Sequence, residues 1–375
     1  MTTIINGSSP SITFSDGSAQ TSATRPFQNR IINGNMSIDQ RNAGAQTTPS
    51  GSGYFSLDRY GIQNNTGGSR FTSQQNAGSV TPPVGFANYL GLTSTSAYSV
   101  ASGDACGIYQ NIEGFNTADL NWGTANAKTV TLSFWVRSSL TGTFGGSLVN
   151  SAGNRSYVFS YTISVANTWE QKSITIAGDT SGTWVGATNG TGIALNIGIG
   201  TGTTYSGTAG SWSGTYLLNV TGNTSVVGTN GATFYITGVQ LEVGSTATSF
   251  DYRPYGTELA LCYRYYQSIA YTANSILAIG LCTSTTNQEC TIILLQTMRS
   301  TPTITLPSAG QTSGTISFLT SASAYPATTG TNAVNNPSVN NFVVSGGSYS
   351  ASFVQGNATW LYPNGNVTIK ASAEL

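Results

Sequence analysis

Few side chains in this sequence are suited to catalysis, and histidine is absent from its 375 residues. Without histidine, the chain builds neither the Ser-His-Asp and Cys-His nucleophile systems nor the usual zinc sites. A phosphate-binding loop of the Gly-x-x-x-x-Gly-Lys-Ser/Thr type is also missing. Paired carboxylates, as in glycoside hydrolysis, are the remaining route to an enzyme. Nothing in the sequence sets two of its thirteen acidic residues face to face, so we expect no enzyme.

Three carboxylates are singled out by their surroundings in the sequence. Glu242 alternates with Gln240 along a predicted strand, and we expect it on the outer face, either solvated or paired with a nearby arginine. Many β-sandwiches bind calcium through carboxylates and carbonyls in loops. In the stretch DACGIYQNIEG, Asp104 and Glu113 are the candidates for such a calcium site. Apart from calcium, we expect the protein to hold no cofactor.

Aromatic side chains offer a different kind of site. Four aromatic residues lie in or near segments rich in Gly, Thr, Ser and Asn: Trp122, Trp184, Trp212 and Tyr205. Sugar rings stack on such flat, amphipathic faces, and neutral Asn, Thr and Gln side chains supply hydrogen bonds, so these four are glycan-binding candidates. The alternative is that each tryptophan fills the protein core, and for Trp169 packing in the core or at its rim is favoured.

The composition excludes several classes of protein. Charged residues make up 7% and the net charge is zero, whereas a nucleic-acid binder needs a dense basic patch. No stretch of 18 apolar residues is present and the beginning lacks a basic, apolar leader, so we expect neither membrane insertion nor a targeting signal. Aromatics at 10% argue for a folded chain. Cys282 and Cys290 are placed to bridge across a hairpin, although free buried thiols are the commoner case.

Apolar residues alternate with polar ones along much of the chain, which predicts β-strands. In KTVTLSFWVRSS, Val130, Leu132, Phe134 and Val136 fall on one face. In FYITGVQLEVG the alternation shifts at Gly238, as at a bulge. Similar strands are expected in NRSYVFSYTISV, TWEQKSITIAG and GTYLLNVTG. Short strands joined by Gly-rich turns predict an all-β protein with a jelly-roll β-sandwich.

Charge and tyrosine gather in one place, and the only helix is predicted there. The helix is predicted in GTELALCYRYYQSI, where Thr257 is placed to cap it and Glu258 falls in its first turn. Because tyrosine-rich segments also favour strands, a strand is the alternative. We expect this stretch to form a rigid structural joint in which acidic residues 242, 251 and 258 neutralise the two arginines and tyrosines pack between domains or between chains. Its residues are Arg253, Pro254, Tyr255, Glu258 and Arg264.

The same stretch divides the chain into three predicted parts. Residues 1–30 form an extended attachment arm, since their apolar residues are too few for a core. Residues 31–255 form the large jelly roll. Residues 256–375 form a second, smaller β-sandwich, with strands in ECTIILLQT, TPTITLP, GTISFLT, NFVVSG, YSASFV and VTIKASAEL and a loop-like region SASAYPATTGTNAVNNPSVN.

Several motifs along the chain carry a family resemblance. They are IINGNMSIDQRNAG (31–44), YFSLDRYGI (54–62), GVQLEVGSTATSFDYRPYGTELALCYRYYQ (238–267), TMRSTPTITLP (297–307) and ASAEL (371–375). Together they resemble a β-sandwich domain, similar to carbohydrate-binding-module jelly rolls, of phage tail fibres and other virion structural proteins, many from aquatic and cyanobacterial hosts. The beginning, MTTIINGSSPSITFSDGSAQTSA, resembles the leader of phage fibre proteins.

The resemblance implies a role on the virion. It implies a tail-fibre or spike subunit that attaches to other virion proteins through residues 1–30 and recognises host-surface polysaccharide. It names no catalytic or ligand residue. By analogy with phage fibres, and because few charges keep copies apart, we expect a homotrimer. The alternatives are a head- or capsid-attached fibre or decoration protein without a receptor role and, less favoured, a glycan-degrading enzyme.

Overall fold

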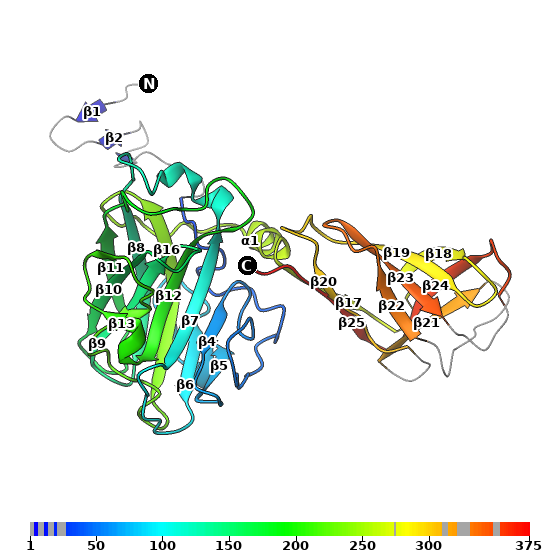
Figure 1. Cartoon of the computed structure of the whole chain (residues 1–375), viewed down its shortest axis with the longest axis horizontal. Coiled ribbons are helices and arrows are strands. Elements are labelled where there is room, and N and C mark those ends of the chain that lie inside the picture. Colours follow the sequence, from blue (N-terminus) through cyan, green and yellow to red (C-terminus); the bar gives the residue numbers. More distant parts are fainter. Residues whose placement is uncertain are drawn as a thin grey trace.

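The computed structural model describes residues 28–273, 275–309, 314–320, 331–347 and 353–375, together with the backbone of three short strands before residue 21. Two β-sandwiches of unequal size lie end to end, and a single α-helix and the C-terminus lie between them (Figure 1). The protein is all-β apart from this helix and a few short 3₁₀ turns. In the described ranges, no helix is long and apolar enough to cross a membrane.

The larger sandwich consists of two antiparallel sheets packed face to face. Sheet one has the order β14 (Trp212–Ser213), β10 (Ser156–Ile163), β9 (Gly142–Val149), β12 (Thr191–Thr201), β7 (Ala105–Glu113) and β4 (Gly61–Asn64). Sheet two has the order β11 (Glu170–Ile176), β8 (Val130–Ser138), β16 (Thr233–Val243), β6 (Leu90–Ser94) and β5 (Phe71–Gln75). The chain crosses repeatedly between the sheets, as in a jelly roll.

Small elements connect these strands. They are the parallel pair β13 (Ser206–Gly207) and β15 (Asn219–Val220) and the 3₁₀ turns η1 (Ala77–Ser79), η2 (Gly114–Asn116), η3 (Ala118–Leu120) and η4 (Thr203–Tyr205). The strand expected in GTYLLNVTG is reduced to the two residues of β15. Its neighbours instead form a loop lying over sheet one, where Asn219 packs against Gly145 and Gly198.

The alternation seen in the sequence places side chains as predicted. In β8, Val130, Leu132, Phe134 and Val136 are all buried in the core between the sheets. The pairing of β16 with β8 shifts register between Thr237 and Gln240, where Gly238 has a φ of +63°. This is the predicted bulge, and glycine is favoured there because other residues rarely adopt positive φ.

The expectation that Glu242 lies solvated or beside an arginine is wrong. Glu242 and Gln240 do point away from the core, but both are fully buried because the chain after β16 folds back over this face. The Glu242 carboxylate accepts hydrogen bonds from the Gln240 amide and from the backbone N–H and hydroxyl of Thr248. These donors satisfy the buried carboxylate without a cation.

The smaller sandwich also consists of two antiparallel sheets. One has the order β17 (Tyr266–Tyr271), β25 (Val367–Ser372) and β20 (Thr303–Thr305). The other has the order β21 (Thr315–Thr320), β24 (Ala358–Asn364), β18 (Ala278–Cys282), β19 (Gln288–Ile293), β23 (Asn341–Gly347) and β22 (Thr331–Asn335). Its core includes Cys282 and Cys290, which are buried free thiols and form no bridge. Residues 349–352 of the expected strand YSASFV and 321–330 of the loop-like region lie outside the described residues.

The helix α1 spans Tyr255–Tyr263 and is shorter than the predicted one. Thr257 does not cap it: Pro254 is the N-cap residue, its carbonyl accepts from the N–H groups of Thr257 and Glu258, and no side chain caps the helix. The chain leaves the helix because Tyr266 begins β17, which pairs along its whole length with β25. Both the helix and the strand interpretations of this stretch are therefore right for part of it.

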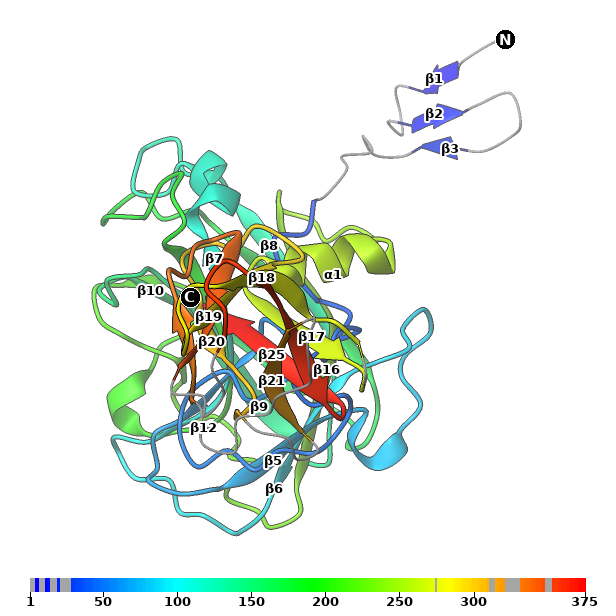
Figure 2. The same ribbon diagram turned by 90° about the vertical axis from the view of Figure 1, so that its right-hand side faces the viewer.

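The predicted arm is only partly described. Backbone strands β1 (Ile4–Asn6), β2 (Ser11–Thr13) and β3 (Ala19–Gln20) form a small antiparallel sheet standing apart from the larger sandwich (Figure 2). Residues 1–3, 7–10, 14–18 and 21–27 lie outside the described residues. Asn29, the second-last residue of the predicted arm, is buried and its side chain donates to Val239 in β16, and the boundary at residue 30 stays a prediction. The division at residue 255 stays a prediction.

Candidate functional site

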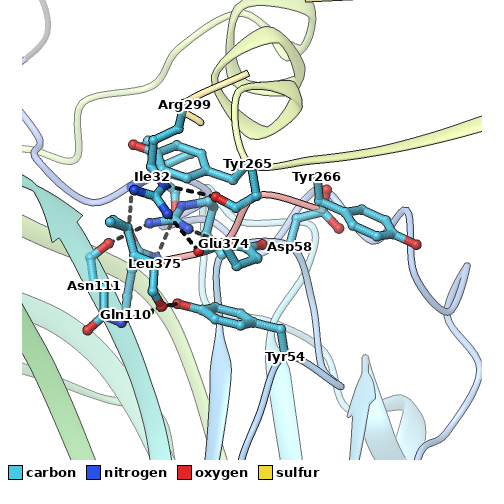
Figure 3. Close-up of polar contacts among 12 residues, drawn as sticks. Ile32, Tyr54, Asp58, Gln110, Asn111, Tyr265, Tyr266, Arg299, Glu374 and Leu375 are labelled. Carbon is cyan, nitrogen blue, oxygen red and sulfur yellow. Dashed lines mark hydrogen bonds and ion pairs between the residues drawn. The ribbon is translucent and has the colours of Figure 1, made fainter. Parts of the chain in front are cut away.

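Four stretches far apart in the sequence meet between the two sandwiches (Figure 3). We call this region the joint and define it as residues 29–41, 54–60, 253–266 and 373–375. Its apolar centre is a separate small cluster made by Ile32, Ile38, Cys262 and Tyr265. Every one of these stretches overlaps a motif on which the phage-fibre resemblance rests. The motif residues therefore converge in space at a place where two bodies are held together.

The centre of the joint is a buried ion pair between Arg59 and Glu374. Arg59 is fully buried and its guanidinium also donates to the backbone carbonyl of Asn111 in β7. The guanidinium lies over the ring of Tyr265, 3.5 Å from its centroid. Removing one partner of such a pair leaves an uncompensated charge in a low-dielectric site, which is strongly unfavourable. Neither residue was singled out from the sequence.

A second arginine and a second carboxylate surround this pair. Arg41 donates to the other oxygen of Glu374 at 2.8 Å and lies 3.6 Å from the ring centroid of Tyr266. Asp58 is also buried and accepts from the backbone and side-chain amide of Gln40. Burial raises the pKa of Asp58 to about 7, against the opposing effect of these hydrogen bonds. The joint therefore holds a carboxyl group that keeps its proton in mildly acidic solution.

The last residues of the chain are fixed from several sides. Arg299 donates to the carbonyls of Ala373 and Glu374 at 2.9 Å each. The terminal Leu375 accepts from the hydroxyl of Tyr54 and the side chain of Asn111, both at 2.9 Å (Figure 3). The C-terminal strand of the smaller sandwich thus ends inside the contact with the larger one.

The predicted joint residues divide into two groups. Arg253 and Glu258 form a buried ion pair at 3.2 Å, and Arg253 also donates to the carbonyls of Asn29 and Ile31. Pro254 begins the helix, as described above. Tyr255, in contrast, is 63% exposed. It does not pack between the domains, because it lies on the first turn of α1 and points away from the joint's core.

Arg264 belongs to the joint, but its partner is not one of the acidic residues expected from the sequence. It donates twice to Glu113, at 2.8 and 2.6 Å, and Tyr265 donates to the same carboxylate at 2.7 Å. Burial by itself raises the pKa of Glu113, but these three hydrogen bonds hold it below its ordinary value. Glu113 ends β7 of the larger sandwich, so this contact again ties the helix to that sandwich.

The structure does not bring the two calcium candidates together. Asp104 precedes β7 and Glu113 is the last of its nine residues, which separates them by roughly 30 Å. Asp104 accepts instead from the Tyr98 hydroxyl and the Ala101 backbone at 2.6 and 2.7 Å. Among the described residues, no three carboxylate or thiol groups gather as they would around a metal ion.

The fold brings the three tryptophan candidates together, and their rings pack against one another. The rings of Trp122, Trp184 and Trp212 lie 4.8 to 5.5 Å apart with nearly perpendicular planes. Their indole N–H groups donate to Lys128, Asp179 and Ala177 of the same chain. Trp122 is buried in the sandwich core and the other two are half-buried against it. The structure thus shows an aromatic cluster at the core's rim.

Tyr205 and Trp169 lie elsewhere on the larger sandwich. Tyr205 is half-buried in η4 and meets the ring of Tyr216 edge-on at 5.9 Å. Trp169 packs against Tyr89 and donates its indole N–H to Thr81, so it lies at the rim of a small apolar cluster as expected. Tyr205 is near Trp212 in the sequence, but its ring partner is Tyr216 and not one of the three tryptophans.

Comparison with known proteins gives no family. No family model matches the sequence, and no curated protein matches it. Among solved structures, the enzymatically active domain of tailspike protein 4 of bacteriophage CBA120 is similar with 13% identity and a TM-score of 0.28, over 59% of this chain and 22% of that chain. This chain thus spans less than a quarter of that protein's length.

Carbohydrate-binding modules are also among the similar structures. The family 11 module from Clostridium thermocellum, solved with a β-1,3-1,4-mixed-linked tetrasaccharide, has 11% identity and a TM-score of 0.26, over 54% of this chain and 98% of that one. A xylan-binding domain from Paenibacillus barcinonensis has 9% identity and a TM-score of 0.25, over 60% and 100%. TM-scores this low do not define a fold, and the all-β class follows from the sheets described above.

Proposed function

We propose that this protein is a structural subunit of a phage virion, a tail fibre or spike, that presents its β-sandwiches to glycans on the host surface. The observation that carries the proposal is the convergence of the motifs on the joint. Their charged residues lock the two sandwiches together, as in Arg59–Glu374 and Arg41–Glu374, and fasten the helix to the larger sandwich, as in Arg253–Glu258. Such a joint suits a protein that holds binding surfaces at a fixed distance from its attachment point.

Attachment is assigned to the residues that precede the larger sandwich. The described chain enters the joint at Asn29, whose backbone N–H donates to Asp251. The strands β1 to β3 stand apart from the larger sandwich (Figure 2), which fits an arm that binds other virion proteins. Removing residues 2–25 is expected to leave a folded protein that no longer joins virions.

Self-association as a homotrimer is part of the proposal, and the smaller sandwich supports it. On its larger sheet, Ile279, Leu281 and Ile293 point outward and are 64%, 57% and 77% exposed. Glu289, paired with Leu281 on the same hairpin, is the one charged residue in β18 and β19. A nearly uncharged apolar face is buried against another subunit without charge repulsion, and such faces are typical of subunit contacts. Mass photometry at micromolar concentration tests it, and a stable monomer contradicts it.

Antibodies against the folded protein test the virion role directly. Purified phage particles that encode this chain are labelled with antibody and gold and viewed by electron microscopy. Label at the tail supports the fibre or spike, and label on the head supports a head-attached fibre or decoration protein instead. Particles without label contradict the virion role. In parallel, release of new reducing ends from host polysaccharide would reveal a glycan-degrading enzyme.

A further inference from the structure

A pocket of about 450 Å³ lies beside the joint, between the two sandwiches. One wall is the outer face of the sheet β17-β25-β20, with Thr303, Thr305 and Lys370. The opposite wall comes from the larger sandwich, with Arg41, Tyr54 and Phe55. Its volume falls within the range of roughly 300–1,000 Å³ found for small-molecule sites. None of these residues was assigned a binding role from the sequence.

Lys370 differs from the other cations of this chain. Every other lysine and arginine in the described ranges contacts a carboxylate, another oxygen or an aromatic ring. Within the same ranges, the Lys370 ammonium makes no hydrogen bond, ion pair or ring contact. Its strand alternates strictly, so that Val367, Ile369 and Ala371 face the core while Lys370 is exposed on the pocket side.

The remaining lining is neutral or aromatic. Thr303 and Thr305 pair with Ser372 and Lys370 across the strands, which places their hydroxyls on the same face as the ammonium. Phe55 is 46% exposed although it is a large apolar side chain. No aspartate or glutamate of the described residues lines the pocket, and Arg41 shares the single negative charge of Glu374 with Arg59. The free charge of the pocket is therefore positive.

We propose that this pocket binds a sugar unit that carries a carboxylate. The ammonium of Lys370 pairs with the carboxylate, the threonine hydroxyls bond to sugar hydroxyls, and the ring of Phe55 covers the apolar face of the pyranose. This inference rests on the glycan binding in the proposed function, and it assigns that binding to the cleft between the sandwiches and not to the tryptophan cluster.

The first experiment compares acidic sugars with their neutral esters. The full chain is titrated calorimetrically with a trigalacturonate, a trimannuronate, a hyaluronan tetrasaccharide and sialyllactose, and with the methyl ester of each. We expect at least one acid to bind and its ester to bind roughly three- to tenfold more weakly, as for a partly exposed ion pair. An ester that binds as tightly as its acid overturns the charge assignment while leaving glycan binding intact. If no acid binds, the inference fails, whereas the virion role is judged separately by antibody labelling.

Labelling the lysine side chains tests where on the protein the acidic sugar binds. The chain has three lysines, Lys128, Lys172 and Lys370. Reductive methylation with ¹³C keeps their charge and gives a small number of resolved methyl signals. The binding acid is expected to shift the signal of Lys370, while Lys128 and Lys172 hold their positions beside Asp119 and Glu170. An unmoved Lys370 signal during saturating binding places the site elsewhere and overturns the inference.

Variants complete a thermodynamic cycle. In Lys370→Met, which keeps most of the apolar stem, the acid and its ester should bind equally, because the charge that distinguishes them is gone. Phe55→Ala should weaken acid and ester alike. The matched control Lys128→Met removes the same charge from another surface and should keep the wild-type preference. If Lys128→Met and Lys370→Met lose the preference equally, only the overall charge matters and the pocket is not the site.

Discussion

The joint and the pocket beside it lie between the same two sandwiches, yet they treat charge in opposite ways. In the joint, Arg59 and Arg253 are buried and each has a carboxylate partner. In the pocket, Lys370 faces solvent and has none among the described residues. Burial explains the difference, because an unpaired charge costs several kcal/mol inside a protein and little in water. A charge left free is therefore tolerated only where the surface stays open, which is also where a ligand has access.

The largest expected effect is in the joint. Glu374→Gln removes the charge that balances Arg59 and Arg41, and we expect the free energy of unfolding to fall by about 3–5 kcal/mol. The matched control is Glu170→Gln, which breaks the Glu170–Lys172 pair near the surface and should cost about 0.2–1 kcal/mol. Urea unfolding measures both, and small-angle scattering reports whether the sandwiches separate. Equal losses in the two variants would contradict the special role of the joint.

Asp58 makes the stability of the joint depend on pH. Its pKa is about 7 in the folded protein and about 3.9 in an unfolded chain. Between these values the folded state holds the proton and the unfolded state releases it, so stability is full below about pH 4 and falls as pH rises towards 7. The difference between these two pKa values corresponds to about 4 kcal/mol. The absence of histidine leaves few other groups titrating in this window.

Urea unfolding at intervals from pH 4 to pH 8 tests this slope. Asp58→Asn cannot ionise, so its stability should stay nearly constant over the same range. The carboxyl groups whose pKa is lowered in the fold, such as Glu113 and Asp119, lose their contribution only as the pH falls below about 4. A wild-type protein that grows more stable between pH 4 and pH 7 would show that Asp58 is ionised in the fold.

A structural feature could be predicted from the sequence where the residues that cause it are close together in the chain. The strand β8 followed from its own alternation of apolar residues, and the bulge in β16 followed from one glycine. The end of α1 did not, because Tyr266 turns into a strand to pair with Ser372, far along the chain. Only the folded topology brings that partner near.

In the candidate site, too, the ion pairs between residues far apart in the sequence could not be predicted. The buried pair Arg253–Glu258 spans one turn of chain and was within reach of sequence reasoning. The partner of Arg264 is Glu113, 151 residues away, and the partner of Arg59 is Glu374, 315 residues away. A signal for them did exist, since LDRY and ASAEL were among the motifs of the resemblance. Their role as one buried network required the structure.

A smaller effect is expected in the tryptophan cluster. Trp184 is half-buried and fills space between Trp122 and Trp212, so Trp184→Ala should lower the free energy of unfolding by about 1–3 kcal/mol, less than for a fully buried tryptophan. Binding of the acidic sugars should stay unchanged, because the cluster is not part of the pocket. Calorimetry and urea unfolding measure the two quantities. Lost sugar binding with unchanged stability would restore the cluster as the glycan site.

The smallest effect is expected at Tyr255, although it lies within the joint's own sequence. Its ring is 63% exposed, and substitutions at such positions usually change stability by less than about 0.5 kcal/mol. Arg253→Ala, two residues earlier, leaves Glu258 buried without its cation and should cost several times more. Comparing the melting temperatures of the two single variants separates a buried ion pair from an exposed aromatic. If Tyr255→Ala dissolves the oligomer while the fold stays intact, the exposed ring is a contact between chains, and the joint then extends beyond a single copy.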